Sequence, residues 1–157
     1  SQTNARYATF STFWWESRIE PQCRMACASG LLGPEDARLA ERMVRRRAES
    51  WHLDQSKPRL IHGDLWNGNV LFNQKGESIL IDPSVAYGHP EQDLAMLELF
   101  GSPVPQSALD LAAANCGLLP DRQERSGFFQ LYPLLVHVNL FGAGYVSGVR
   151  RVLRQYE

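Results

Sequence analysis

Four polar side chains within residues 62–82 have the types and spacing that phosphoryl transfer requires. His62 and Asp64 flank a glycine, Asn69 follows Asp64 by five residues, and Asp82 follows Asn69 by thirteen. A carboxylate such as Asp64 can accept the proton of an attacking hydroxyl. An amide oxygen and a second carboxylate are ligands that Mg²⁺ accepts, with phosphate oxygens and water completing its coordination. The segment therefore predicts a general base beside a pair of metal ligands.

A predicted β-hairpin must bring these side chains together. Two short apolar runs flank the polar residues 73–78, which include Gly76, and this pattern is typical of a hairpin. Pairing the runs about the turn places Asn69 opposite Asp82, with Cα atoms roughly 5 Å apart. Because Asp64 directly precedes the first strand, we expect it at the same end of the hairpin.

The same residues also have an ordinary structural explanation. The His-Gly-Asp run could form a simple turn, and Asn69 and Asp82 could only satisfy backbone groups at strand ends. Each residue taken singly favours that explanation. Their order around one hairpin favours a phosphoryl-transfer site.

The rest of the chain predicts helices around this small sheet. Apolar periodicity and the placement of proline and glycine indicate the helix boundaries. Helices are expected at residues 9–29 with a kink or new start at Pro21, at 34–51, from Pro90 onward, at 106–116, and at 123–156 with interruptions near Pro133 and at 142–144. The predicted fold class is mainly α with a small β-hairpin (α+β). A chain of 157 residues can form one ordinary domain with a core, so we expect residues 1–157 to form a single domain.

Bulk composition argues against several classes of protein. Hydrophobic residues at 44% and charged residues at 21% are values of a globular protein. The net charge of −1 provides no basic field for nucleic acid or an anionic membrane. The most apolar stretch, residues 131–149, is interrupted by polar residues and predicts no membrane span. Three cysteines without disulfide-like or zinc-like spacing predict reduced thiols and a cytoplasmic protein.

These motifs together resemble those of a known family. Residues 62–69 read HGDLWNGN, and they are followed by IDP at 81–83, YGH at 87–89 and DLAM at 93–96. The H-x-D-x-x-x-x-N run with an Asp after the hairpin resembles the catalytic core of the kinase-like phosphotransferases, which include protein kinases and aminoglycoside phosphotransferases. The full set is more similar to the fructosamine kinases (ketosamine-3-kinases), from about Phe13 to the end of the chain.

The resemblance implies roles for five residues of the site. Asp64 would be the catalytic base toward a sugar hydroxyl. Asn69 and Asp82 would be the magnesium ligands. His62 would brace the loop, and Asp93 would anchor that loop from the following helix. The implied cofactors are Mg²⁺ and ATP.

The resemblance also implies a substrate and a pocket. The substrate would be a ketosamine (a glycated amine or protein), phosphorylated on a sugar hydroxyl as in deglycation. Trp66 would form a wall of the sugar pocket. Tyr87 and His89 could line the same pocket, although core packing or a loop hydrogen bond explains them equally well.

A phosphotransferase of this kind needs a second, nucleotide-holding lobe with a Gly-rich loop, a strand lysine and a helix glutamate. None is visible in residues 1–157, where Lys57 and Lys75, the only lysines, lie in or beside loops. The chain therefore resembles the kinase-like C-terminal catalytic and substrate-binding lobe alone. Two alternatives are an inactive binding or scaffold remnant of the same fold and a kinase for another small hydroxylated amine or an aminoglycoside-like substrate. A phosphate-ester hydrolase is disfavoured because the second metal cluster that such enzymes use is missing.

Overall fold

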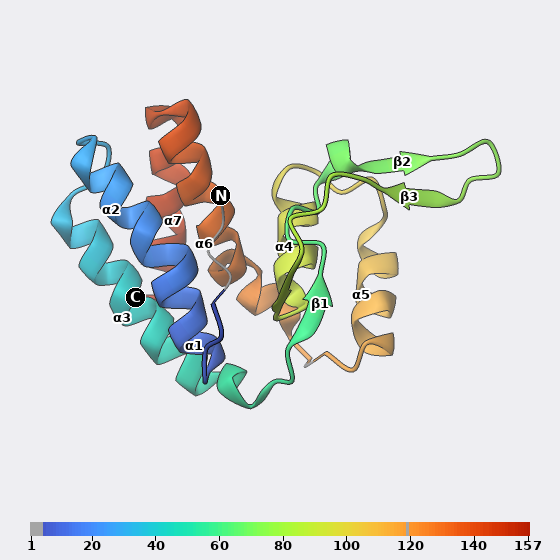
Figure 1. Cartoon of the computed structure of the whole chain (residues 1–157), viewed down its shortest axis with the longest axis horizontal. Helices are drawn as coiled ribbons and strands as arrows, with labels where there is room; N and C mark the ends of the chain where they lie inside the picture. Colours follow the sequence, from blue (N-terminus) through green and yellow to red (C-terminus); the bar gives the residue numbers. More distant parts are fainter. Residues whose placement is uncertain (1–4, 119) are drawn as a thin grey trace. The chain divides into compact units, whose positions relative to one another are not determined.

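The computed structural model describes residues 5–118 and 120–157 and is mainly helical, with two short antiparallel strand pairs (Figure 1). The predicted fold class is confirmed, and the second strand pair is an addition to it. The chain divides into two compact units, one made of Ser1–Lys57 with Gln130–Glu157 and the other of Pro58–Phe129. The single-domain assignment stays a prediction.

The first unit begins with a nearly continuous helical stretch. It consists of α1 (Phe10–Phe13), the π-helical turn η1 (Trp14–Ile19) and α2 (Glu20–Ala28). Thr9 caps α1, because its Oγ1 accepts a hydrogen bond from the Thr12 amide at 3.2 Å. Pro21 lies in the first turn of α2, directly after the π-helical turn η1, and π-helical turns are a common place for a change in helix geometry. The kink or new start predicted at this proline corresponds to the change from the π-helical to the α-helical pattern just before it, and the helix itself continues.

Helices α3 (Pro34–Ser50) and α7 (Val146–Gln155) complete the packing of the first unit. Pro34 occupies the first helical position, as predicted. Helix α3 contacts both α2 and α7. The apolar faces of this unit are buried, and its largest fully buried side chains are Trp14, Ile19, Met43, Leu53, Leu131, Leu135 and Leu153.

Helix α6 (Arg122–Phe141) runs through Pro133 without a break, so the predicted interruption there is wrong. The flanking Leu131 and Leu135 are fully buried. Their packing offsets the roughly 3 kcal/mol that a proline costs inside a helix. The helix ends before Gly142, whose φ of 85° a residue with a side chain rarely adopts. The predicted interruption at 142–144 is confirmed, since the short helix η4 (Ala143–Tyr145) separates α6 from α7.

The second unit contains both strand pairs and carries all the predicted site residues. Strand β1 (Arg59–Ile61) pairs antiparallel with β4 (Ala86–Gly88), and β2 (Val70–Phe72) pairs antiparallel with β3 (Ser78–Leu80). Its helices are α4 (Glu91–Leu99), α5 (Gln106–Asn115) and the first turns of α6. The hairpin β2–β3 extends away from α4 as a narrow ribbon (Figure 1), and its apolar side chains are about half exposed.

The hairpin forms as predicted, but its register differs from the predicted one by one residue. Val70 pairs with Leu80, so Asn69 lies opposite Ile81 and not opposite Asp82. The Ile81 amide accordingly donates to the Asn69 carbonyl at 3.1 Å. Asp82 lies one residue beyond the paired segment.

The turn of the hairpin explains the shift. The Asn73 side-chain oxygen accepts hydrogen bonds from the amides of Lys75 and Glu77 at 2.9 and 3.0 Å. The Asn73 amide donates to the Glu77 carbonyl at 3.0 Å, which closes a loop of three residues. Gly76 supplies the left-handed conformation that such a loop needs, with a φ of 78°. An odd loop length therefore replaces the even one expected from the apolar pattern.

The structure bears on the expectations about membrane spans and cysteine thiols. Within the two described stretches, no helix combines the length and hydropathy needed to cross a membrane. All three cysteines are free thiols. The cytoplasmic location itself stays a prediction.

Candidate functional site

The loop after β1 carries Asp64 and is closed by a tight backbone approach. The Ser84 amide donates to the His62 carbonyl at 2.8 Å. Gly63 has a φ of 81°, and a Cβ at this position would collide with the Ser84 carbonyl oxygen and lie 3.0 Å from its carbonyl carbon. Only glycine fits both the left-handed backbone and the space. The chain after β3 therefore holds the loop against displacement from one side.

Asp93 holds the same loop from the side of α4. Its two carboxylate oxygens accept hydrogen bonds from the amides of His62 at 2.7 Å and of Gly63 at 2.8 Å. Burial raises the pKa of the Asp93 carboxyl, and these two hydrogen bonds oppose the rise because they favour the charged form. Asp93 thus lies on the following helix, where an anchor for the catalytic loop was predicted.

The His62 ring links the loop to the end of the hairpin. Its Nδ1 accepts a hydrogen bond from the Asp64 amide at 3.4 Å, and its Nε2 lies 3.0 Å from the Ile81 carbonyl oxygen. Because a carbonyl oxygen only accepts, Nε2 is the donor in the contact with Ile81. These contacts connect the loop before β2 to the residue directly before Asp82, which supports the bracing role predicted for His62.

The structure places the predicted base and one predicted metal ligand in direct contact. The Asn69 side-chain nitrogen donates to the Asp64 carbonyl at 2.9 Å and reaches its carboxylate Oδ2 at 3.3 Å. Asn69 is 6% exposed, so its amide is held in one orientation. Its amide oxygen takes no part in these two bonds and can act as a ligand to a cation.

Asp82 supplies the second predicted metal ligand from an unusual backbone position. Its φ of 51° is left-handed, which aspartate tolerates better than most residues with a side chain. Among the described residues, no group of three or more His, Cys, Asp or Glu side chains is arranged to hold a metal ion. Mg²⁺ commonly binds one or two carboxylates together with substrate phosphates. One oxygen from Asn69 and one from Asp82 would match that mode, and their role as a metal pair stays a prediction.

The three residues predicted to contact substrate differ in exposure. Trp66 is 40% exposed, and its ring covers Gly68 so closely that a Cβ there would lie 2.5 Å from Cζ2. Tyr87 is 70% exposed on β4, whereas His89 is 4% exposed. The His89 ring stacks on Phe129 with centroids 5.0 Å apart. Burial lowers the pKa of His89 to about 4, and the nearby Arg125 charge acts in the same direction. Substrate contacts for all three stay predictions.

Two residues that position the site were not found from the sequence. The Ser84 amide donates to the His62 carbonyl, and the Ser84 carbonyl oxygen lies where a Cβ on Gly63 would be. Gln92 caps the start of α4, since its side-chain oxygen accepts the His89 amide at 2.8 Å. A capping side chain three residues after the donor is a local signal that could have identified Gln92. Ser84 acts through its backbone, so its residue type carried no such signal.

Comparisons with known proteins identify the family. The family model described as fructosamine kinase matches residues 1–157. The chain belongs to the fructosamine kinase family. This confirms the family predicted from the HGDLWNGN, IDP, YGH and DLAM segments.

Individual relatives agree with this assignment. A probable ketoamine kinase of Enterococcus faecium is 36% identical over 155 residues, which cover 99% of this chain and 56% of the relative. A chloroplastic protein-ribulosamine 3-kinase of Arabidopsis thaliana is 33% identical over 102 residues, which cover 64% of this chain and 30% of the relative. The chain spans about half the length of the first curated relatives that it matches.

A solved structure shows the same fold. The crystal structure of a "putative fructosamine-3-kinase" from Thermobifida fusca matches with a TM-score of 0.86 and 41% identity, over 98% of this chain and 54% of that one. This fructosamine kinase family member thus has the kinase-like fold that its sequence predicted.

Proposed function

We propose that this chain is the catalytic and substrate-binding lobe of an ATP-dependent kinase that phosphorylates a sugar hydroxyl of ketosamines. The observation that carries the proposal is the contact between Asp64 and the buried Asn69, on a loop that Asp93 and Ser84 hold from two sides. Relatives named ketoamine kinase and protein-ribulosamine 3-kinase support the substrate class.

In the proposed reaction, Asp64 is the general base. Its carboxylate accepts the proton of the sugar hydroxyl while the hydroxyl oxygen attacks the γ-phosphorus of ATP, and ADP leaves. The Asn69 side-chain nitrogen donates toward Asp64 and keeps the carboxylate oriented. A magnesium ion bound by Asn69 and Asp82 would neutralise charge on the phosphates.

The exposed Trp66 and Tyr87 supply aromatic surface on which a sugar ring can pack. Trp66 lies two residues after Asp64, so a sugar against its ring would be close to the base. We further infer that the protein works in the cytoplasm, as its free thiols suggest.

The test uses a full-length chimera in which this chain replaces the matching segment of the Thermobifida fusca relative. Phosphate transfer from ATP to fructoselysine is measured by ADP release and by ³¹P NMR of the product. We expect activity that the Asp64→Asn variant lowers by about 10²- to 10⁴-fold in kcat. Glu77→Gln, which removes the same charge at the exposed hairpin turn, serves as the matched control and should retain full activity.

Two results would contradict the proposal. The first is a folded chimera that binds ATP but phosphorylates no ketosamine while the unmodified relative does so. The second is an Asp64→Asn variant as active as the Glu77→Gln control, which would remove Asp64 from the role of base.

A further inference from the structure

Helix α4 carries acidic side chains on two opposite faces. Glu91 and Glu98 are seven residues apart, so they lie on one face of the helix, and Asp93 lies about 200° around the axis from Glu91. Asp93 accepts the amides of the loop that precedes Asp64. The glutamate face points instead toward the first turns of α6.

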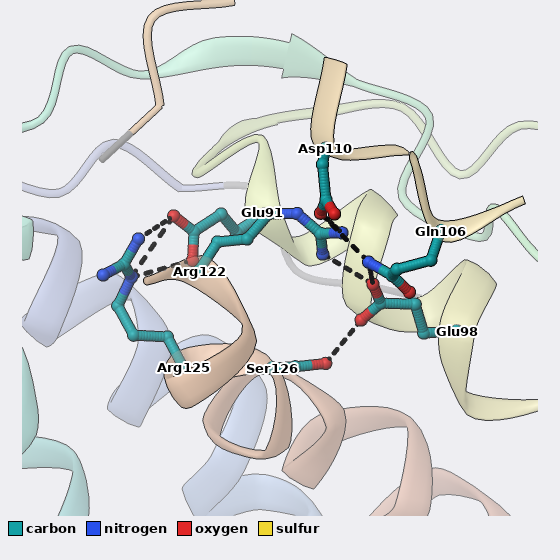
Figure 2. A network of polar contacts seen from close by, with 7 residues as sticks. All are labelled: Glu91, Glu98, Gln106, Asp110, Arg122, Arg125 and Ser126. Carbon is teal, nitrogen blue, oxygen red and sulfur yellow. Dashed lines mark hydrogen bonds and ion pairs between the residues drawn. The ribbon is translucent and has the colours of Figure 1, made fainter. Parts of the chain in front are cut away.

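The first of these glutamates is held by a buried, forked ion pair (Figure 2). Arg125 donates from Nη2 to one Glu91 carboxylate oxygen at 2.7 Å and from Nε to the other at 2.9 Å. Its Nη1 donates to the Pro120 carbonyl at 2.9 Å. The two side chains are 3% and 5% exposed. A planar guanidinium bound at both carboxylate oxygens fixes the orientation of the carboxylate as well as its distance.

A buried ion pair contributes little net free energy to folding. Removing two charges from water costs about as much as their attraction returns, and an apolar pair of similar volume often stabilises a fold better. Glu91 and Arg125 therefore provide something that a leucine and a methionine would not. What they provide is a defined position and rotation for the first turn of α4, where Asp93 lies two residues after Glu91.

We propose that Glu91 and Arg125 are positioning residues for the kinase reaction: they fix the first turn of α4 so that Asp93 holds the His62–Gly63 amides and Asp64 lies at its working position. The inference rests on the proposed function for its catalytic consequence. Its structural consequence, the rigidity of the loop, can be measured without any activity.

The chain offers a matched control on the same helix face. Arg122 pairs with Glu98 at 2.6 Å and is also largely buried (Figure 2). This second pair lies at the far end of α4 from Asp93. The double variants Glu91→Leu/Arg125→Met and Glu98→Leu/Arg122→Met remove a pair from either end of one helix.

The first measurement is amide hydrogen exchange on the 157-residue chain. We expect Glu91→Leu/Arg125→Met to speed exchange at the His62 and Gly63 amides by about tenfold or more, because their acceptor is no longer held in place. The control double variant should leave these two amides unchanged. Arg125→Lys keeps the positive charge but cannot bind both Glu91 oxygens in the planar geometry of a guanidinium. It should therefore speed exchange at the His62 and Gly63 amides less than the double variant does. It also provides the answer if the first double variant does not fold.

The second measurement is the kinetics of the same variants in the full-length chimera. Loss of the Glu91–Arg125 pair should lower kcat by roughly 10- to 100-fold with little change in KM for ATP or ketosamine, since a displaced base harms chemistry more than binding. The control should retain kcat. Unchanged exchange at the two amides, or unchanged kcat beside faster exchange, overturns the proposal. A wild-type chimera without kinase activity would overturn the proposed function, and the exchange result would still decide whether the pair holds the loop.

Discussion

Replacing Gly63 by alanine tests whether the loop that carries Asp64 depends on one close backbone approach. The new methyl group would collide with the Ser84 carbonyl at a φ of 81°. Ser84 cannot simply move away, because its amide donates to the His62 carbonyl at 2.8 Å. The loop must then shift and lose contacts on one side or the other.

The size of the effect follows from these contacts and from a matched glycine in the hairpin turn. Gly76 has nearly the same φ, 78°, and no heavy atom lies within 4 Å of the place that an alanine methyl group would occupy there. Gly76→Ala should therefore cost only the left-handed backbone term, about 1–2 kcal/mol. Gly63→Ala carries the same term and also weakens the bonds to Ser84 and Asp93, at about 1 and about 2 kcal/mol. We expect a total of about 4–5 kcal/mol, or about 3 kcal/mol more than the control.

Urea unfolding followed by circular dichroism measures the stability difference, and kinetics of the full-length chimera measures its consequence. A loop displaced by about 1 Å should lower kcat by about 10²-fold. Gly76→Ala should retain kcat. Equal unfolding midpoints and equal kcat for the two variants would refute the reasoning, because the collision would then be absorbed without moving the loop.

Two further predictions concern His89 and Trp66. Burial lowers the pKa of His89 from 6.5 to about 4. Between these pH values the unfolded chain binds a proton at His89 that the folded chain does not. The free energy of unfolding is therefore unaffected by His89 above pH 6.5 and falls by about 3 kcal/mol as the pH is lowered to 4. Urea midpoints across this range should fall less steeply in His89→Asn, which does not titrate, and equal slopes would contradict the assignment. Trp66→Ala should raise KM for the ketosamine by about tenfold with kcat nearly unchanged, as loss of stacking predicts, whereas the exposed Leu111→Ala should leave KM unchanged. An unaltered KM in Trp66→Ala would remove its ring from the sugar pocket.

Features with local signals were predictable from the sequence. The start of α3 at Pro34, the start of α4 directly after Pro90 and the break at 142–144 depend on the conformations that proline and glycine favour, and these hold in any environment. The hairpin was found for the same reason. Its register was not, because the Asn73 side chain and Gly76 together close a three-residue loop where the apolar pattern suggested an even number.

Features that depend on residues far apart in the chain were not predictable in this way. Strand β4 follows β1 by more than twenty residues, and its Ala-Tyr-Gly sequence has no strand pattern of its own. The Glu91–Arg125 pair joins residues 34 apart. One clue was present, since Arg122 and Arg125 lie in the first turn of α6. Cations are disfavoured at a helix N-terminus, so their presence there indicates buried acidic partners.

The left-handed backbone of Asp82 limits which residues can replace it without strain. At a φ of 51°, glycine, asparagine and aspartate are the residues that fold with little strain. Glutamate would keep the negative charge but would carry the backbone strain of a residue that rarely adopts this conformation. The local conformation therefore disfavours the one substitution that preserves the carboxylate, by about 1–2 kcal/mol, before any ligand is considered. Asparagine and glycine are accordingly the substitutions that remove the charge at residue 82 with the least backbone strain.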